Sequence, residues 1–373
     1  MNHDQLIQFY YLVRSLHWNN QVGQLTDEAQ AALVQALTEA QGGIHKAIAK
    51  KVERWGRALQ WTQELEQEVV ASISEALAGT SSAVAEFITA TAVGTATATL
   101  AEYNALLSFD GKASGVKLAE GLSAAQIKQF FEEQPLGGKL LKEWVQDSFD
   151  SGAQASILSA IREGIVAGEG YEALVERVMT ATDIGFIRSR RDVVMLVKTY
   201  VQSANVGAQD VVFKENEDVI KGYVRRETLD NRTCRTCALN DGMFYKKNEQ
   251  RPSLPAHPSC RGVWIPKTAS YKELGIELEE LDEVLRSWNI REDGTIDTGG
   301  KKILSYGKIS GDFGAWYDSL SDKDKAKTSI GPIRGKLLKS GAVTWRELVD
   351  KKTGRPFLLD ELGFDNYGNK MNG

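Results

Sequence analysis

The chain has 373 residues, more than one domain usually contains, so two or three domains are expected. Its 42 % hydrophobic and 25 % charged residues are typical of a globular protein. The net charge of −5 excludes a protein that is basic as a whole, so any contact with DNA must come from a local patch. Proline is scarce, with seven in all, and alanine is abundant in the first two hundred residues, which favours a mainly α fold.

The N-terminal region, residues 1–110, is expected to be helical and of unknown role. Its apolar periodicity predicts helices over 1–22, 26–40, 44–77 and 81–107, the second ending at Gly42-Gly43 and the third at Gly79. The first residues lack the basic and apolar parts of a signal peptide. Residues 87–101 carry no charge but are few and rich in threonine, so no stable membrane insertion is expected.

The central region, residues 111–218, follows a turn-rich linker at 109–115 and is also expected to be helical. Helices are predicted at 123–131, from 137, at 151–165, at 171–180 and at 186–205. The most concentrated basic cluster of the chain lies here and consists of Arg188, Arg190 and Arg191. These arginines are candidates for contact with DNA phosphates, although a solvated face or salt bridges to carboxylates would explain them as well.

A small β module like a zinc knuckle or treble clef is predicted at residues 219–267, with short strands at 220–229, 242–245 and 263–266. All three cysteines of the chain lie in it, together with one of only four histidines. The four residues are Cys234, Cys237, His257 and Cys260. Three thiolates and one imidazole suit a tetrahedral zinc ion, and the two-residue gap lets both sulfurs of a tight turn face one ion.

Such a site would be structural, because four protein ligands fill the zinc shell and leave no position for water. Two alternatives remain open. The cysteines could be free thiols with His257 in a loop, or Cys234 and Cys237 could form a strained disulfide.

The C-terminal region, residues 268–373, is expected to be mixed and mostly helical. An acidic helix is predicted at 270–288, a loop or arm at 289–309 and a helix at 313–339, ending before Gly341. Short apolar pieces follow at 345–349 and 358–362.

The usual motifs of hydrolases and nucleotide-binding enzymes are missing from the sequence, so no enzyme is predicted. No histidine is followed by glutamate, as a zinc protease requires. The segment from Gly331 to Leu337 imitates a phosphate-binding loop, but its glycines are too close and leucine replaces the required Ser or Thr. A zinc-supported nuclease or other hydrolase is the alternative, but His257, the only histidine near the cluster, is already assigned to the metal.

Taken as a unit, the cysteine-rich stretch resembles the head-morphogenesis family of tailed phages, the Mu-like minor head proteins. The family pattern is Asp, a short gap, Arg-Thr-Cys-x-x-Cys, Leu-x-Gly and, later, Pro-x-His-Pro-x-Cys-Arg. The matching stretches here run from Thr228 to Gly242 and from Pro255 to Arg261, with one extra residue before Gly242. The family often has a further cysteine after that arginine, where this chain has Gly262.

Two weaker pieces agree with this resemblance, which covers roughly residues 120–362. Residues 197–205 are similar to the family's Arg-Thr-Glu helix, with Lys198 and Tyr200 as departures. Residues 313–320, 331–341 and 358–362 are similar to its C-terminal segment of spaced Trp, Gly, Arg and Leu.

The resemblance implies a minor capsid protein of the virion that associates with the portal protein and other capsid proteins. Its expected role is in head morphogenesis, DNA packaging or DNA ejection, with packaged double-stranded DNA as a further partner. It also implies a protein made in the host cytoplasm and located inside the head or at the portal vertex.

Overall fold

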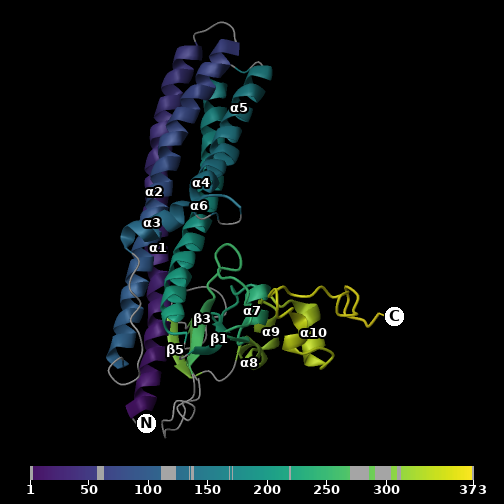
Figure 1. Ribbon diagram of the computed structural model, residues 1–373. Helices are drawn as coiled ribbons and strands as arrows, with labels where there is room; N and C mark the ends of the chain where they lie inside the picture. Colours follow the sequence, from purple (N-terminus) through teal and green to yellow (C-terminus); the bar gives the residue numbers. More distant parts are fainter. Residues whose placement is uncertain are drawn as a thin grey trace. The chain divides into compact units, whose positions relative to one another are not determined.

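The computed structural model confirms a mainly α fold, with 66 % of the chain in helices (Figure 1). The structure describes residues 3–56, 63–110, 123–133, 135, 138–167, 169, 171–217, 220–268, 285–289, 304–308 and 312–371. The linker was predicted at 109–115, but residues 109 and 110 end a helix, and residues 111–115 lie outside the described residues. Most of the acidic segment at 270–288 also lies outside them.

Three long helices dominate: α1 (His3–Gly56), α2 (Gln63–Asp110) and α6 (Tyr171–Glu215). The shorter helices are α3 (Ala124–Glu133), α4 (Leu141–Phe149), the π-helix η1 (Asp150–Gln154), α5 (Ala155–Val166), α7 (Arg235–Asn240), α8 (Phe313–Ser319), α9 (Asp322–Lys325), α10 (Pro332–Lys339) and the 3₁₀-helix η2 (Trp345–Leu348). The strands are β1 (Ile220–Arg226), β2 (Phe244–Lys246), β3 (Val263–Thr268), β4 (Leu285–Asn289) and β5 (Leu304–Lys308).

The chain divides into two compact units, to both of which the long helices contribute. One unit consists of residues 23–98 and 122–205, and the other of residues 1–22, 99–121 and 206–373. The four ranges predicted from the sequence follow changes of composition, whereas these units follow contacts, so the predicted ranges stay a prediction.

The predicted helix ends at Gly42-Gly43 and Gly79 were wrong, because α1 and α2 run through these glycines. A Cβ added at any of the three would meet nothing within 4 Å. An isolated glycine weakens a helix by roughly 1 kcal/mol, which the packing of a long helix easily exceeds. The same reasoning applies to α6, which joins the two helices predicted at 171–180 and 186–205.

In the unit of residues 23–98 and 122–205, a glycine pair lets two helices approach closely. A Cβ at Gly185 in α6 would lie 2.6 Å from Ala153 Cα, and one at Gly152 in η1 would lie 2.4 Å from Ser189 Oγ. The buried Ser189 hydroxyl donates a hydrogen bond of 2.7 Å to the carbonyl of Ser148. The π-helix and α6 are therefore in backbone contact, and Phe149 and Phe186 pack edge to face beside them.

The other unit contains the β module, an antiparallel sheet of order β2-β1-β3. Tyr223 of β1 pairs with Tyr245 of β2, and Arg225 of β1 pairs with Trp264 of β3. Residues 227–229 of the longer predicted first strand lie beyond β1, whereas the third strand extends to Thr268.

Two predictions for the C-terminal region were wrong. The helix predicted at 313–339 is three separate helices, because Ser321 begins a new one as its N-cap and Gly331, with φ at +80°, precedes Pro332 at the start of α10. The residues described within the predicted acidic helix and the predicted loop after it, 285–289 and 304–308, form a strand pair instead, with β4 antiparallel to β5 and Ser287 opposite Tyr306.

Residues 71–105 of α2 are long and apolar enough to cross a membrane by length and composition alone. Core helices pass the same test, and Ile88, Ala92 and Thr99 of this segment are fully buried. The expectation of no stable membrane insertion stays a prediction.

Candidate metal centre

The β module brings Cys234, Cys237, His257 and Cys260 to one place. Cys234 is the N-cap of α7, where its sulfur accepts a hydrogen bond of 3.4 Å from the amide of Cys237. The α-helical turn therefore directs both sulfurs to the same side. His257 and Cys260 lie in the loop between β2 and β3, and Cys260 precedes β3 by two residues.

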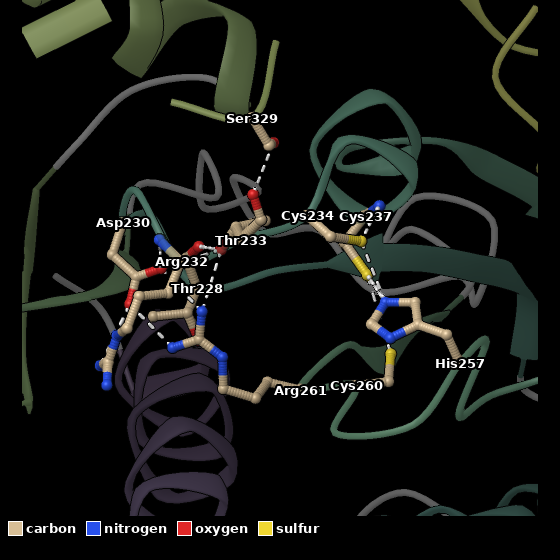
Figure 2. A network of polar contacts seen from close by, with 10 residues as sticks. All are labelled: Thr228, Asp230, Arg232, Thr233, Cys234, Cys237, His257, Cys260, Arg261 and Ser329. Atoms are coloured by element: carbon tan, nitrogen blue, oxygen red, sulfur yellow. Dashed lines mark hydrogen bonds and ion pairs between the residues drawn. The ribbon is translucent and has the colours of Figure 1, made fainter. Parts of the chain in front are cut away.

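The ligand atoms are close enough to share an ion. His257 Nε2 lies 3.0 Å from Cys234 Sγ and 3.1 Å from Cys237 Sγ, and the sulfurs of Cys237 and Cys260 are 3.7 Å apart. Two thiolates of one tetrahedral zinc ion would be about 3.8 Å apart, from a Zn–S bond of about 2.3 Å. The cluster could therefore bind a metal ion such as zinc (Figure 2).

The histidine has the tautomer that a metal needs. His257 Nδ1 lies 2.8 Å from the carbonyl oxygen of Pro258, to which it donates its proton. Since Nδ1 carries the proton, Nε2 presents its lone pair to the sulfurs when the ring is neutral.

The four side chains share protons in a way that prepares them for a cation. Hydrogen bonds from Cys237 and His257 lower the pKa of Cys234 to about 4, and the bond from Cys237 also lowers the pKa of Cys260. As the donor to both, Cys237 has a raised pKa. The hydrogen bond to Cys234 raises the pKa of His257 to about 9. The lowered pKa values favour the thiolate form of Cys234 and Cys260, and a metal would replace the protons of Cys237 and His257.

Sequence reasoning missed a buried ion pair at this site, formed by Arg225 and Glu227. Arg225 donates from Nε to Glu227 Oε1 over 2.7 Å and from Nη2 to Cys237 Sγ over 3.4 Å. Glu227 is close enough to Cys237 and Cys260 to form a second possible ligand group with them. Burial raises its pKa to about 7, against the lowering effect of Arg225. The sequence predicts both residues as part of one strand, but Glu227 lies just beyond β1. Only the fold brings the two side chains next to the cysteines.

Glu227 also explains Gly262. A Cβ at this position would lie 2.3 Å from Glu227 Oε1, so no side chain fits there while Glu227 keeps its place. A cysteine at position 262, as the family pattern often has, would compete with this carboxylate for the same space.

A second polar network stabilises the loop before the first cysteine (Figure 2). Arg261 donates two hydrogen bonds of 2.7 Å to the two carboxylate oxygens of the buried Asp230, and the Arg232 amide donates another of 3.0 Å. Burial raises the pKa of Asp230, but the bonds from Arg261 outweigh it and hold the pKa below its usual value. Because Arg261 follows Cys260, this pair fixes one half of the cluster to the other.

The C-terminal region contacts the module at several points. Asp241 accepts from the amide of Glu227 over 2.9 Å and from the amide of Phe313 over 2.6 Å. The Ser329 hydroxyl donates to the Thr233 carbonyl over 2.7 Å. These bonds satisfy buried polar groups next to the cysteine–histidine cluster, so the module and residues 312–371 support each other.

The predicted DNA-contact cluster does not form one patch. Arg188 and Arg191 are exposed and lie one turn apart on α6. Arg190 is half-buried on another face and donates to Gln41 over 3.1 Å. Only two of the three arginines are therefore free to meet phosphate, and the DNA contact stays a prediction.

Comparison of the chain with protein-family models, with curated proteins and with solved structures gave no match.

Proposed function

We propose that the cluster is a structural zinc centre with Cys234, Cys237, His257 and Cys260 as its four ligands. The donor set, the Nδ1–H tautomer of His257 and the spacing of 3.7 Å between Cys237 and Cys260 support zinc. A bound ion would cross-link the start of α7 to the loop between β2 and β3, in a module whose sheet has three strands.

We further propose that the protein is a minor head protein of a tailed phage that associates with the portal and acts in head assembly, DNA packaging or DNA ejection. The observation that carries this proposal is that the separate parts of the family pattern meet at one site. Asp230 of the first part forms a bidentate ion pair with Arg261 of the second part. Both parts also contribute ligands to the proposed zinc centre. This gives a physical reason for the aspartate, the second arginine, the histidine and the three cysteines of the pattern.

The test is whether the chain enters phage particles. Cells in which the encoding phage assembles would express the wild type, Cys260→Ser or Lys352→Gln, and nuclease-treated particles would be purified by density gradient. We expect the wild type and Lys352→Gln, an exposed substitution far from the ligands in sequence, to copurify with heads at low copy number. Cys260→Ser should be lost from them because its module fails to fold. Absence of the wild type from heads at every stage of assembly would refute the proposal.

A separate experiment tests the alternative that the protein is a nuclease or another hydrolase. The purified wild-type protein would be incubated with duplex DNA and zinc, magnesium or manganese. We expect no cutting, because the proposed zinc shell has four protein ligands and no position for water. Metal-dependent cutting that disappears in Cys260→Ser would favour the nuclease instead.

A further inference from the structure

Two arginines, one in α10 and one in α7, lie at the start of α10. Arg334 lies in the first turn and is 8 % exposed, and Arg235 is the first residue of α7. Neither forms a salt bridge with a carboxylate in the part of the chain that the structure describes. Arg235 Nη2 lies 3.7 Å from the position that a Cβ on Gly331 would take, so its guanidinium is beside the N-cap of α10.

The two guanidiniums repel each other, and their hydrogen bonds are incomplete. Burial, and then the charge of Arg235, lower the pKa of Arg334. Arg334 Nη2 donates to the carbonyl of Phe357 over 2.7 Å, but its buried Nε has no hydrogen-bond partner. Arg235 Nε donates to the carbonyl of Ser329 over 3.0 Å. Among the described residues, the hydrogen bonds of both guanidiniums thus go to neutral carbonyls. A buried cation next to another cation is unstable without an anion.

The N-terminus of α10 adds further hydrogen-bond donors. Gly331, the N-cap, offers no side chain to the first turn, and Pro332 has no amide proton. The amides of Ile333 and Arg334 have no acceptor within the helix, and the positive end of the helix dipole lies there. Pro332 is exposed and Gly331 and Ile333 are half-exposed, so a ligand can reach these groups.

We propose that Arg235, Arg334 and the first turn of α10 form a binding site for a phosphate group. Two guanidiniums, which match phosphate oxygens, and a helix N-terminus are the groups that bind phosphate in many proteins. The same site would accept inorganic phosphate or a phosphodiester of a nucleic acid. Arg235 stands between the proposed zinc ligands Cys234 and Cys237 in the sequence, but its guanidinium lies beside the N-cap of α10. The inference therefore does not depend on the proposed function.

The first test uses the full-length wild-type protein, labelled with ¹⁵N at isoleucine and arginine, and titrated with inorganic phosphate at constant ionic strength. We expect the amide signals of Ile333 and Arg334 to shift and saturate, while sodium chloride leaves them in place. This measurement needs no substitution. If the signals of both amides stay unchanged at saturating phosphate, the proposal is wrong.

The second test compares Arg235→Gln with Lys352→Gln, which removes the same charge from an exposed position. Calorimetry should show phosphate bound about tenfold more weakly by Arg235→Gln, as expected when one charged hydrogen-bond donor is lost. Lys352→Gln should change the affinity less than about twofold. If both substitutions weaken phosphate binding equally, only the net charge of the protein matters, and the proposed site is wrong.

A short DNA duplex then identifies the source of the phosphate. If the duplex binds, is displaced by inorganic phosphate and is bound more weakly by Arg235→Gln, the site takes the nucleic-acid backbone. If inorganic phosphate binds as predicted and the duplex does not compete with it, the site takes a free phosphate. Both results support a phosphate site, and neither depends on whether the chain enters phage heads.

Discussion

At the scale of single residues, the protonation of the His257 ring indicates whether the cluster binds a metal. Its pKa is raised to about 9 by the hydrogen bond to Cys234, so the metal-free ring should be charged at pH 8. A zinc ion needs the neutral ring and should expel the proton at that pH. Long-range ¹H–¹⁵N spectra of the histidine rings, recorded with and without zinc, would follow this change.

The matched variant for that experiment is Cys234→Ser, which removes the thiolate that keeps the ring charged. Its metal-free His257 should titrate close to the ordinary value of about 6.5. If the wild-type ring also titrates near that value, the proton sharing described for the cluster is wrong.

Asp230 should matter for stability far more than an exposed aspartate. Asp230→Asn would leave Arg261 without its charged partner and should lower the free energy of unfolding by about 2 kcal/mol, a value reduced because Arg261 is partly exposed. The control, Asp318→Asn, changes an exposed carboxylate and should cost less than about 0.5 kcal/mol. Urea unfolding of the zinc-loaded proteins would measure both, and similar midpoints would contradict the role given to Asp230.

Which site residues could be predicted from the sequence depends on how rare each residue type is. Three cysteines and a histidine within 27 residues form a pattern that composition alone rarely produces, so the four ligands could be named in advance. Arg225 and Glu227 could not, because arginine and glutamate are common and nothing local in the sequence marks these two as buried beside the cysteines. The arginine pair at α10 was missed for the same reason, since Arg235 and Arg334 are 99 positions apart.

At the scale of helices and strands, two glycines that look alike in sequence should respond in opposite ways to the same substitution. Gly43→Ala should stabilise the protein by about 0.5–1 kcal/mol, because the helix continues there and the added methyl meets nothing. Gly185→Ala should destabilise it by about 1–3 kcal/mol, because the methyl would push α6 away from η1.

Thermal unfolding followed by circular dichroism would compare these two variants with the wild type. Gly207→Ala, whose methyl also meets nothing, serves as a second control and should behave like Gly43→Ala. A stabilised Gly185→Ala would mean that the two helices are not in backbone contact.

These glycines show why element boundaries were the weakest part of the sequence analysis. Local propensity predicts that a helix ends at Gly42-Gly43. The helix continues because buried side chains on either side, such as Leu37 and Ile44, stabilise it. The reverse error occurred at 313–339, where the helical pattern was broken by Ser321 and by the left-handed Gly331. The three strands around the cysteines were predicted as elements because alternation and turn residues marked them, but their ends differ from those of β1, β2 and β3 by up to three residues.

At the scale of the whole molecule, removal of the metal should affect the two units unequally. The β module has a small sheet and depends on the proposed ion, whereas the unit of residues 23–98 and 122–205 has its own apolar core, which includes Leu33, Ile88 and Phe186. Hydrogen exchange with and without a strong chelator should therefore show faster exchange in residues 220–268 and 312–371. Residues 73–98 and 178–205 should keep their protection, and a uniform loss of protection would contradict this division.

The bonds from Asp241 to Glu227 and Phe313 have a consequence for synthesis on the ribosome. While the chain emerges, all four proposed ligands leave the exit tunnel before the segment that completes their surroundings. During that interval the thiolates are open to oxidants and to competing soft cations such as copper. Cells that are short of zinc, or under oxidative stress, should therefore accumulate damaged newly made chains, while protein finished beforehand survives.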